Sequence, residues 1–397
     1  MPVGRPHSQP ARAVPVEGGL RVRANGIRSA GRRVADPAAL TVVLVIVVFW
    51  WLTLAVQGSP GDWGFDFRQF WQGGRDVLGG ESPYPSAALL STAGDHLDPE
   101  GIRDVFRFPY PAGALVVLAP FGLLEFHAAA AVWSALLIVA LLAAVRILGV
   151  TDWRVLAVVV SSAPVISSVR LGTLTPLLVL ALAVAWRWRD RTWVAAAALA
   201  AAIALKLFLW PVLLWLVVTR RLAAAGAALG IAAVGTLGAW AVLGFDGMTS
   251  YPELLRRLTD VVADRGYSLV ALGVRAGLPE PLPDVLPWLV GLALLVGVVH
   301  VRHRADGDRV AFSLAIVAAL ALTPIVWLHY FALLVVPLAL ARPRIAWAWV
   351  LMWAFWLIPD QQNGGDAWRI ALASAVVGGL VAAVLRPRPL PLGAAGD

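Results

Sequence analysis

The chain has 397 residues, of which 60% are hydrophobic and only 14% are charged, and its formal net charge is +8. A water-soluble domain of this size cannot bury so much apolar surface, so the composition excludes a set of two or three soluble domains and predicts an integral membrane protein. The positive charge does not indicate a nucleic-acid-binding protein, because the arginines gather in short stretches between apolar runs. The absence of cysteine excludes disulfides and thiolate metal sites.

The N-terminal segment, residues 1–37, is rich in Arg, Pro, Gly and Ala and shows no apolar periodicity, so we expect a disordered cytoplasmic tail. Residues 38–57 then provide roughly 20 mostly apolar positions, enough to cross the hydrocarbon core of a bilayer. A cleaved signal peptide is the alternative, but both the leading segment and the apolar run are too long for one.

Basic clusters set the orientation of the chain. The positive-inside rule assigns to the cytoplasm the clusters and tail at residues 186–191, 219–221, 301–304, 341–344 and 386–397. Further apolar runs lie near residues 127–146, 155–169, 174–186, 193–205, 207–218, 222–243, 284–301, 310–324, 330–341, 345–358 and 367–385. The chain therefore reads as an all-α polytopic membrane protein with about 12 transmembrane helices in one domain, residues 38–385.

The parity of the spans places most of the unusual polar residues on the outer side. Residues 58–111 form the first extracytoplasmic loop, and 244–283 form a large later one. The run 193–218 starts and ends inside, so it must be a pair of short helices that meet near Lys206. The proline-punctuated run 112–124 is too short for a full span and is predicted to be re-entrant or interfacial.

The first outer loop contains FDFRQFWQGGRDVL at Phe65–Leu78, in which aromatic and charged residues alternate at roughly helical spacing. This pattern predicts an amphipathic helix in the membrane interface, with an apolar face of Phe67, Phe70, Trp71 and Leu78 on the membrane and a polar face of Arg68, Arg75 and Asp76 toward water. Asp66 lies at the helix start, where a carboxylate either caps free N–H groups or is available for chemistry.

Four stretches, taken in chain order, resemble the pattern of glycosyltransferase family 87. They are DFRQFWQGGRDVLGGESPY at 66–84 with FPYP at 108–111, SVRLG at 168–172, ALKLFLWP at 204–211 and PIVWLHY at 324–330. Proteins of this family are polyprenyl-phosphate-mannose-dependent mannosyltransferases of actinobacterial envelopes, within the membrane glycosyltransferase superfamily C. The resemblance spans residues 40–385 and implies the superfamily C fold for this chain.

The resemblance implies that Asp66 is the catalytic base, since the family is expected to have an aspartate early in the first outer loop. A positioned carboxylate that takes the proton of an attacking sugar hydroxyl typically contributes about 10²–10⁴-fold to the rate. A plain helix cap is the alternative role for Asp66. Asp62 and Asp76 are the reserve candidates for the base.

The leaving group implied by the resemblance is a lipid phosphate, which needs cations where negative charge develops. Lys206 lies in an apolar segment, where a charge is costly and usually functional, although a lysine that snorkels to the interface is the alternative. His329 matches the W-x-H pattern of the family, against a purely structural histidine. Arg170 lies at an outer turn against the positive-inside trend, and simple headgroup contact is its alternative.

Further polar residues of the outer segments are candidate contacts for the sugar or the acceptor, namely Tyr84, Tyr110, Tyr267 and Ser268. Two departures from the family pattern leave the donor sugar and the acceptor open. Thr173 and Thr175 stand where the family commonly has Gln and Asn, and Gly266-Tyr267-Ser268 stands for Asn-Gln-Ser. Both changes remove amides that could bind sugar hydroxyls.

The outer loops contain no P-loop, no HExxH motif and no Asp-x-Asp pair, so we expect neither a metal ion nor a cofactor. Asp95, His96 and Asp98 could bind a cation, but their segment is rich in turn residues and reads better as a polar loop.

The sequence thus predicts an enzyme of the bacterial cell membrane with both termini in the cytoplasm and the active site outside. It would move a hexose, with mannose implied by the resemblance, from a polyprenyl-phosphate sugar to an extracytoplasmic glycolipid or glycan, with inversion. Its partners are this donor, the acceptor and membrane lipids, and no nucleic acid. A polytopic transporter or lipid flippase is the rival, because it shares the span count and proline-broken helices. A scaffold with a degenerate site is the third alternative.

Overall fold

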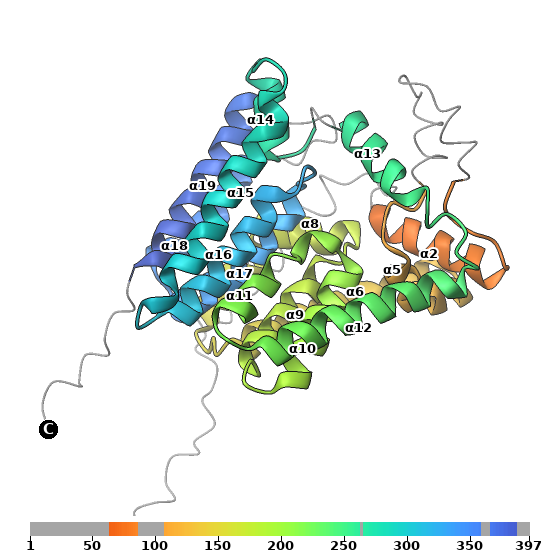
Figure 1. Cartoon of the computed structure of the whole chain (residues 1–397), viewed down its shortest axis with the longest axis horizontal. Helices are drawn as coiled ribbons and strands as arrows, with labels where there is room; N and C mark the ends of the chain where they lie inside the picture. The colour runs from red at the N-terminus through yellow and green to blue at the C-terminus, as the bar shows by residue number, and fades with distance from the viewer. Residues whose placement is uncertain (1–62, 86–106, 263–264, 359–365, 387–397) are drawn as a thin grey trace, which may run out of the picture. The chain divides into compact units, whose positions relative to one another are not determined.

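The structure is a computed structural model that describes residues 63–85, 107–262, 265–358 and 366–386 (Figure 1). All of them belong to one compact unit, residues 42–397. Within these ranges every regular element is a helix. The predicted tails and the predicted first span at 38–57 lie outside the described residues, except for Arg386, and so do Asp62 and the loop with Asp95, His96 and Asp98.

The α-helices are α2 (Phe65–Leu78), α5 (Ala112–Leu118), α6 (Phe126–Ile147), α7 (Trp153–Ser161), α8 (Ala163–Leu171), α9 (Thr175–Arg187), α10 (Thr192–Leu205), α11 (Val212–Val218), α12 (Leu222–Val242), α13 (Tyr251–Val262), α14 (Leu269–Arg275), α15 (Leu282–His300), α16 (Gly307–Leu322), α17 (Val335–Ala341), α18 (Trp347–Ala354) and α19 (Ala367–Leu385). Short 3-10 helices extend or connect them, namely η2 (Ala119–Leu123), η3 (Leu207–Leu209), η4 (Val301–His303), η5 (Leu328–Leu334) and η6 (Phe355–Leu357).

Several helices are apolar enough to lie in a bilayer. Four are long enough to cross it alone, namely Phe126–Ile147, Leu222–Val242, Leu282–His303 and Ala367–Leu385. The bent pair α7–α8 counts as a fifth, and the other apolar runs form helices of 10–17 residues. The all-helical membrane class is thereby supported, whereas the number of about 12 spans stays a prediction.

The predicted run 155–169 is not one straight helix. α7 and α8 meet at Ser162 with a bend of 58°. Pro164, in the first turn of α8, has no N–H to continue the ladder of α7. The hydroxyls of Ser161 and Ser162 donate to the carbonyl oxygens of Ala157 and Val159 at 2.6 and 2.8 Å, which satisfies the end of α7.

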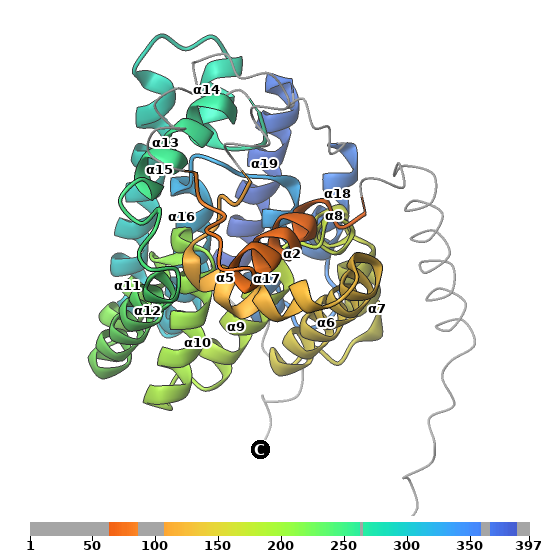
Figure 2. The same cartoon turned by 90° about the vertical axis from the view of Figure 1, so that its right-hand side faces the viewer.

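A helix does form over Phe65–Leu78, but part of its predicted membrane face is buried within the protein. Phe67 and Phe70 are fully buried, and α2 packs on α5, η2 and α6 (Figure 2). The ring of Phe67 stacks on Trp133 at 5.5 Å, and the ring of Phe70 lies 6.1 Å from Phe108. The predicted membrane contact of Phe67 and Phe70 is therefore wrong, because aromatic partners from later helices cover these side chains.

Two other predictions about local structure are confirmed. The run 193–218 forms the short helices α10 and α11, joined through η3, and Lys206 lies at the corner between them. The run 112–124 forms only the short helices α5 and η2, so its shortness is confirmed, while its re-entrant or interfacial placement stays a prediction. The helices α10 and α12 pack along each other, and α15, α16 and α19 form a second packed group (Figure 1).

Candidate active site

The start of α2 is fixed against the turn that follows α8. Gly64 is the N-cap of α2, and its backbone N–H donates to the carbonyl oxygen of Arg170 at 2.8 Å. Gly172 has φ 73°, and a Cβ atom there would lie 2.6 Å from the Cβ of Phe67, so the close approach requires glycine. Asp66, in the first turn of α2, is thus held beside the Arg170 turn. The N-cap role suggested for Asp66 is wrong, because Gly64 has that position.

Lys206 is only 7% exposed and lies in an aromatic cage formed by Tyr110, Phe208 and Tyr330. Its Nζ donates to the Oη of Tyr330 at 2.6 Å. The same Nζ lies 3.9 Å from the ring centroid of Tyr330, 5.4 Å from that of Tyr110 and 5.9 Å from that of Phe208. Aromatic faces attract an ammonium group through their quadrupoles, so the cage stabilises a charge that has left bulk water. This burial rules out the snorkelling alternative.

Asp66 is connected to the same cage. Its carboxylate shares a side-chain hydrogen bond with Tyr110 and interacts electrostatically with Lys206. The carboxylate of Asp66 also interacts electrostatically with the hydroxyl of Tyr330. The Lys206 ammonium group thus contacts Tyr330 and lies over the ring of Tyr110, which in turn is hydrogen-bonded to Asp66, although the four residues come from separate segments of the chain.

His329 lies in η5, is 2% exposed and interacts electrostatically with Lys206. Neither of its ring nitrogens has a hydrogen-bond partner among the described residues. Its carbonyl oxygen accepts a hydrogen bond from the Oγ of Ser168 at 3.4 Å, which ties η5 to α8. Buried polar atoms are nearly always paired, so two orphaned ring nitrogens favour a ligand-binding histidine over a structural one.

Arg170 lies in the last turn of α8, and its Nε is buried without a partner in the described part of the chain. The bond from Gly64 places this residue next to the start of α2, and the packing of α8 on η5 brings it toward the segment of His329. The two threonines of the following turn bond to each other, Thr173 Oγ1 to Thr175 Oγ1 at 3.2 Å.

Tyr84 is hydrogen-bonded to the backbone of Tyr110. Its hydroxyl donates to the carbonyl oxygen of Tyr110 at 2.8 Å, and its ring lies 4.7 Å from Trp240 and 5.7 Å from Phe108. Tyr84 is only 6% exposed. Direct contact of Tyr84 with a sugar therefore stays a prediction, while its packing on Tyr110 is observed.

Tyr267 and Ser268 join the later outer loop to the segment before His329. The backbone N–H of Tyr267 donates to the carbonyl oxygen of Val326 at 2.7 Å. Ser268 is the N-cap of α14, and its Oγ accepts from the backbone N–H of Ala271 at 3.1 Å. Helix capping alone is enough to account for a serine at position 268, so its presence does not require contact with a substrate.

Asp76, a reserve candidate for the base, lies elsewhere on α2. Its Oδ1 accepts from Arg107 at 3.2 Å. Burial raises the pKa of the Asp76 carboxyl, and Arg107 partly offsets this effect. Ten residues of α-helix correspond to about 15 Å, so Asp76 and Asp66 cannot serve one small site.

Sequence reasoning did not single out Tyr330 and Phe208 as part of the site. Their positions carried a signal, since Phe208 follows Lys206 by two residues and Tyr330 directly follows His329. Their rings stack on each other at 5.2 Å with an interplanar angle of 7°, which forms one wall of the cage.

An apolar, all-helical chain that gathers ionisable groups in a buried cluster is typical of membrane enzymes and transporters. A family model decides between these classes. The model of glycosyltransferase family 87 matches residues 108–328, more than half of the chain, and the chain belongs to this family. The protein is accordingly a membrane glycosyltransferase. No curated protein and no solved structure matches it. The matched region contains Arg170 and Lys206, whereas Asp66 precedes it and His329 follows it by one residue.

Proposed function

We propose that the protein transfers a hexose, mannose in the first instance, from a polyprenyl-phosphate sugar to an extracytoplasmic glycolipid or glycan. The observation that supports this most directly concerns the segments that carry Asp66, Arg170, Lys206 and His329, four residues hereafter called the site cluster. Successive members of the site cluster are separated by 104, 36 and 123 positions in the sequence, yet contacts in the structure link their segments.

Asp66 would act as the general base. The acceptor hydroxyl oxygen attacks the anomeric carbon, the bond from that carbon to the phosphate oxygen breaks, and the hydroxyl proton moves to the Asp66 carboxylate. The products are the new glycoside and polyprenyl phosphate. Because one base serves a single displacement and no second carboxylate faces Asp66 in the described cluster, the anomeric configuration would invert.

The cations of the site cluster would hold the phosphate of the donor. Negative charge grows on the phosphate oxygen as the sugar leaves, and preorganised cations or N–H donors stabilise it. Lys206 supplies an ammonium group whose position the aromatic cage fixes. His329 and Arg170 supply nitrogen atoms that have no protein partner among the described residues and are thus available to phosphate oxygens.

The aromatic cage would hold the ammonium group of Lys206 close to the carboxylate of Asp66. Tyr110 bonds to Asp66 and also presents its ring to Lys206. The hydroxyl of Tyr330 accepts from Lys206. A base and a phosphate-binding cation can then share one small site.

A transfer assay tests the proposal. Purified protein in lipid nanodiscs is supplied with radiolabelled polyprenyl-phosphate mannose and a crude lipid extract, and label in the lipid product is measured. We expect incorporation by the natural sequence and a loss of about 10²–10⁴-fold in Asp66→Asn, the usual contribution of a general base. Measured transbilayer movement of the donor without any incorporation would favour the flippase alternative.

Asp76→Asn is the matched control, because it removes a carboxylate from the same helix outside the site cluster. We expect it to keep activity within about threefold, because the Asp76 carboxylate pairs with the exposed guanidinium of Arg107 and lies away from the site cluster. Full activity of Asp66→Asn would refute the assignment, and a loss found only in Asp76→Asn would move the base to that position.

A further inference from the structure

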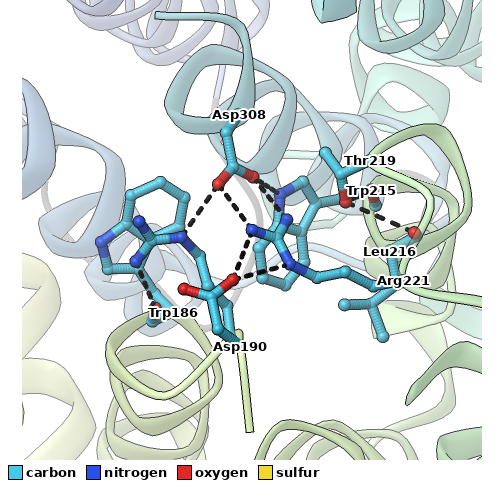
Figure 3. A network of polar contacts seen from close by, with 8 residues as sticks. Trp186, Asp190, Trp215, Leu216, Thr219, Arg221 and Asp308 are labelled. Carbon is cyan, nitrogen blue, oxygen red and sulfur yellow. Dashed lines mark hydrogen bonds and ion pairs between the residues drawn. The ribbon is translucent and has the colours of Figure 1, made fainter. Parts of the chain in front are cut away.

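Two loops that precede α10 and α12 are joined by a set of ion pairs, hereafter the Arg–Asp network (Figure 3). Asp308, at the start of α16, accepts from Arg189 Nε at 2.9 Å and from Arg221 Nη1 at 3.0 Å. It also accepts from Trp215 Nε1 at 2.6 Å. Arg221 donates through Nη2 to Asp190 at 2.9 Å. Two carboxylates therefore neutralise two guanidinium groups.

Three neighbouring arginines are not neutralised by these two carboxylates. Arg187, Arg191 and Arg220 are exposed, and none of them forms an ion pair within the described ranges. The ion pair between Asp190 and Arg221 joins the two loops. Arg191 directly follows Asp190, and Arg220 directly precedes Arg221, so these two exposed arginines lie on the joined loops. The result is a local excess of three positive charges beside the starts of α10 and α12.

An open groove lies next to these charges. It is lined by the first residues of α10 and by two alanines of α12, namely Arg191, Thr192, Trp193, Val194, Ala223 and Ala227. Trp193 is 72% exposed and Leu222, at the start of α12, is 62% exposed. The small alanines leave room between the two packed helices, and the indole forms one border of that room. Cations and an apolar floor thus occur side by side.

We propose that this groove binds an anionic phospholipid, with the phosphate at Arg191 and Arg220 and an acyl chain over Ala223 and Ala227. Charge complementarity selects an anion, since juxtamembrane arginines attract anionic headgroups. The apolar floor and the exposed indole select an amphiphile over a soluble phosphate, because tryptophan side chains prefer the headgroup layer. The positive-inside rule assigns the site to the cytoplasmic leaflet. The arginine-rich N-terminal segment of the chain is an unsuitable occupant, because like charges repel.

The site is separate from the site cluster. Arg191 precedes α10 and Lys206 follows it, and the 14 residues of α10 span about 21 Å. The proposal therefore does not depend on the transferase chemistry, and binding can be measured without a glycosyl donor.

Native mass spectrometry of delipidated protein, titrated with phosphatidylglycerol or with phosphatidylcholine, tests the proposal. We expect the natural sequence to bind one phosphatidylglycerol in preference to phosphatidylcholine. The double variant Arg191→Ala/Arg220→Ala should weaken the first binding step for phosphatidylglycerol about 30-fold, as expected for two arginines near an anionic headgroup. Binding of phosphatidylcholine should not change.

Two further variants separate a site from general attraction. Arg302→Ala/Arg344→Ala removes two exposed arginines from other loops, neither of which lines the groove, and it should change phosphatidylglycerol binding less than about threefold. Ala223→Phe keeps every charge but fills the groove, and it should weaken binding about tenfold through the lost room for the acyl chain.

Three results would each overturn the proposal. They are equal losses in the two double arginine variants, unchanged binding in Ala223→Phe, and displacement of the lipid by equimolar glycerol 3-phosphate, which would indicate a soluble-anion site. Absence of any preference for phosphatidylglycerol would do the same.

Discussion

The Arg–Asp network and the site cluster differ in whether their charged and polar atoms have hydrogen-bond partners within the protein. In the network, each oxygen of Asp308 meets donors, and both partner arginines bind carboxylates. In the site cluster, both ring nitrogens of His329 and the Nε of Arg170 lack partners among the described residues. A satisfied network holds helices together, whereas His329 and Arg170 have bonding capacity left for a substrate.

The two regions lie at opposite ends of the same helices. Lys206 follows α10, and Asp190 precedes it. His329 follows α16 by a few residues, and Asp308 lies in its first turn. The 16 residues of α16 correspond to about 24 Å, close to the thickness of a hydrocarbon core. Substitutions in the two regions should therefore have separable effects on activity and on stability.

Among the substitutions that separate these two regions, the largest effect on activity is expected at Lys206. Lys206→Met keeps the length of the side chain and removes its charge, so transfer activity should fall about 10²–10³-fold, as for the loss of one preorganised electrostatic contact. Thermal unfolding in detergent should change less than activity does, because the Asp66 carboxylate, which loses a neighbouring cation, keeps its hydrogen bond to Tyr110. A variant that kept its activity but unfolded early would assign Lys206 to structure instead of chemistry.

The opposite result is expected for Asp308→Ala. This change leaves Arg189, Arg221 and the indole N–H of Trp215 without their common acceptor, which costs about 1–3 kcal/mol of stability. The midpoint of thermal unfolding should drop, while the activity of the folded fraction should stay unchanged. Asp284→Ala, which removes an exposed carboxylate at the start of α15, is the control and should shift the midpoint far less. Equal shifts in both variants would mean that the network contributes no more than a surface charge.

A smaller effect is expected for Tyr330→Phe. The ring stays in the aromatic cage, but the Nζ of Lys206 loses its acceptor at 2.6 Å. We expect kcat/KM to fall about tenfold, mainly through a higher KM for the lipid-phosphate donor, because a hydrogen bond to a charged group contributes about 1.5 kcal/mol. Tyr251→Phe, which removes a hydroxyl bonded to the carbonyl oxygen of Pro109 at 3.2 Å, is the matched control. An equal loss in the control would reject a specific role for Tyr330.

Much of the fold could be predicted from hydrophobic runs and basic loops. The bounds of α6, α12 and α19 lie within one residue of the predicted runs, and the corner at Lys206 follows from the parity of the basic clusters. The bend at Ser162 and the burial of Phe67 could not be predicted in this way. Both depend on partners that are distant in the sequence or on a single proline, and hydrophobicity alone does not distinguish lipid from protein as the covering surface.

The site was predictable in part for a similar reason. A lysine inside an apolar run is conspicuous, and the motif around His329 is specific enough to notice. The cage residues Phe208 and Tyr330 are ordinary aromatic side chains in an aromatic-rich chain, so only their distances to Lys206 reveal their role. The same holds for Tyr84, whose hydroxyl acts on the backbone of Tyr110.

The account depends on the site cluster and the Arg–Asp network lying on opposite faces of one membrane, which cysteine labelling tests most directly. The chain has no native cysteine, so Arg68→Cys and Pro324→Cys can report on the first face, and Arg191→Cys and Arg304→Cys can report on the second. In intact cells, a membrane-impermeant maleimide should label positions 68 and 324, and it should reach positions 191 and 304 only after the cells are permeabilised. Labelling of positions 68 and 324 from opposite faces would contradict the account, because Asp66 and His329 could not then share one site.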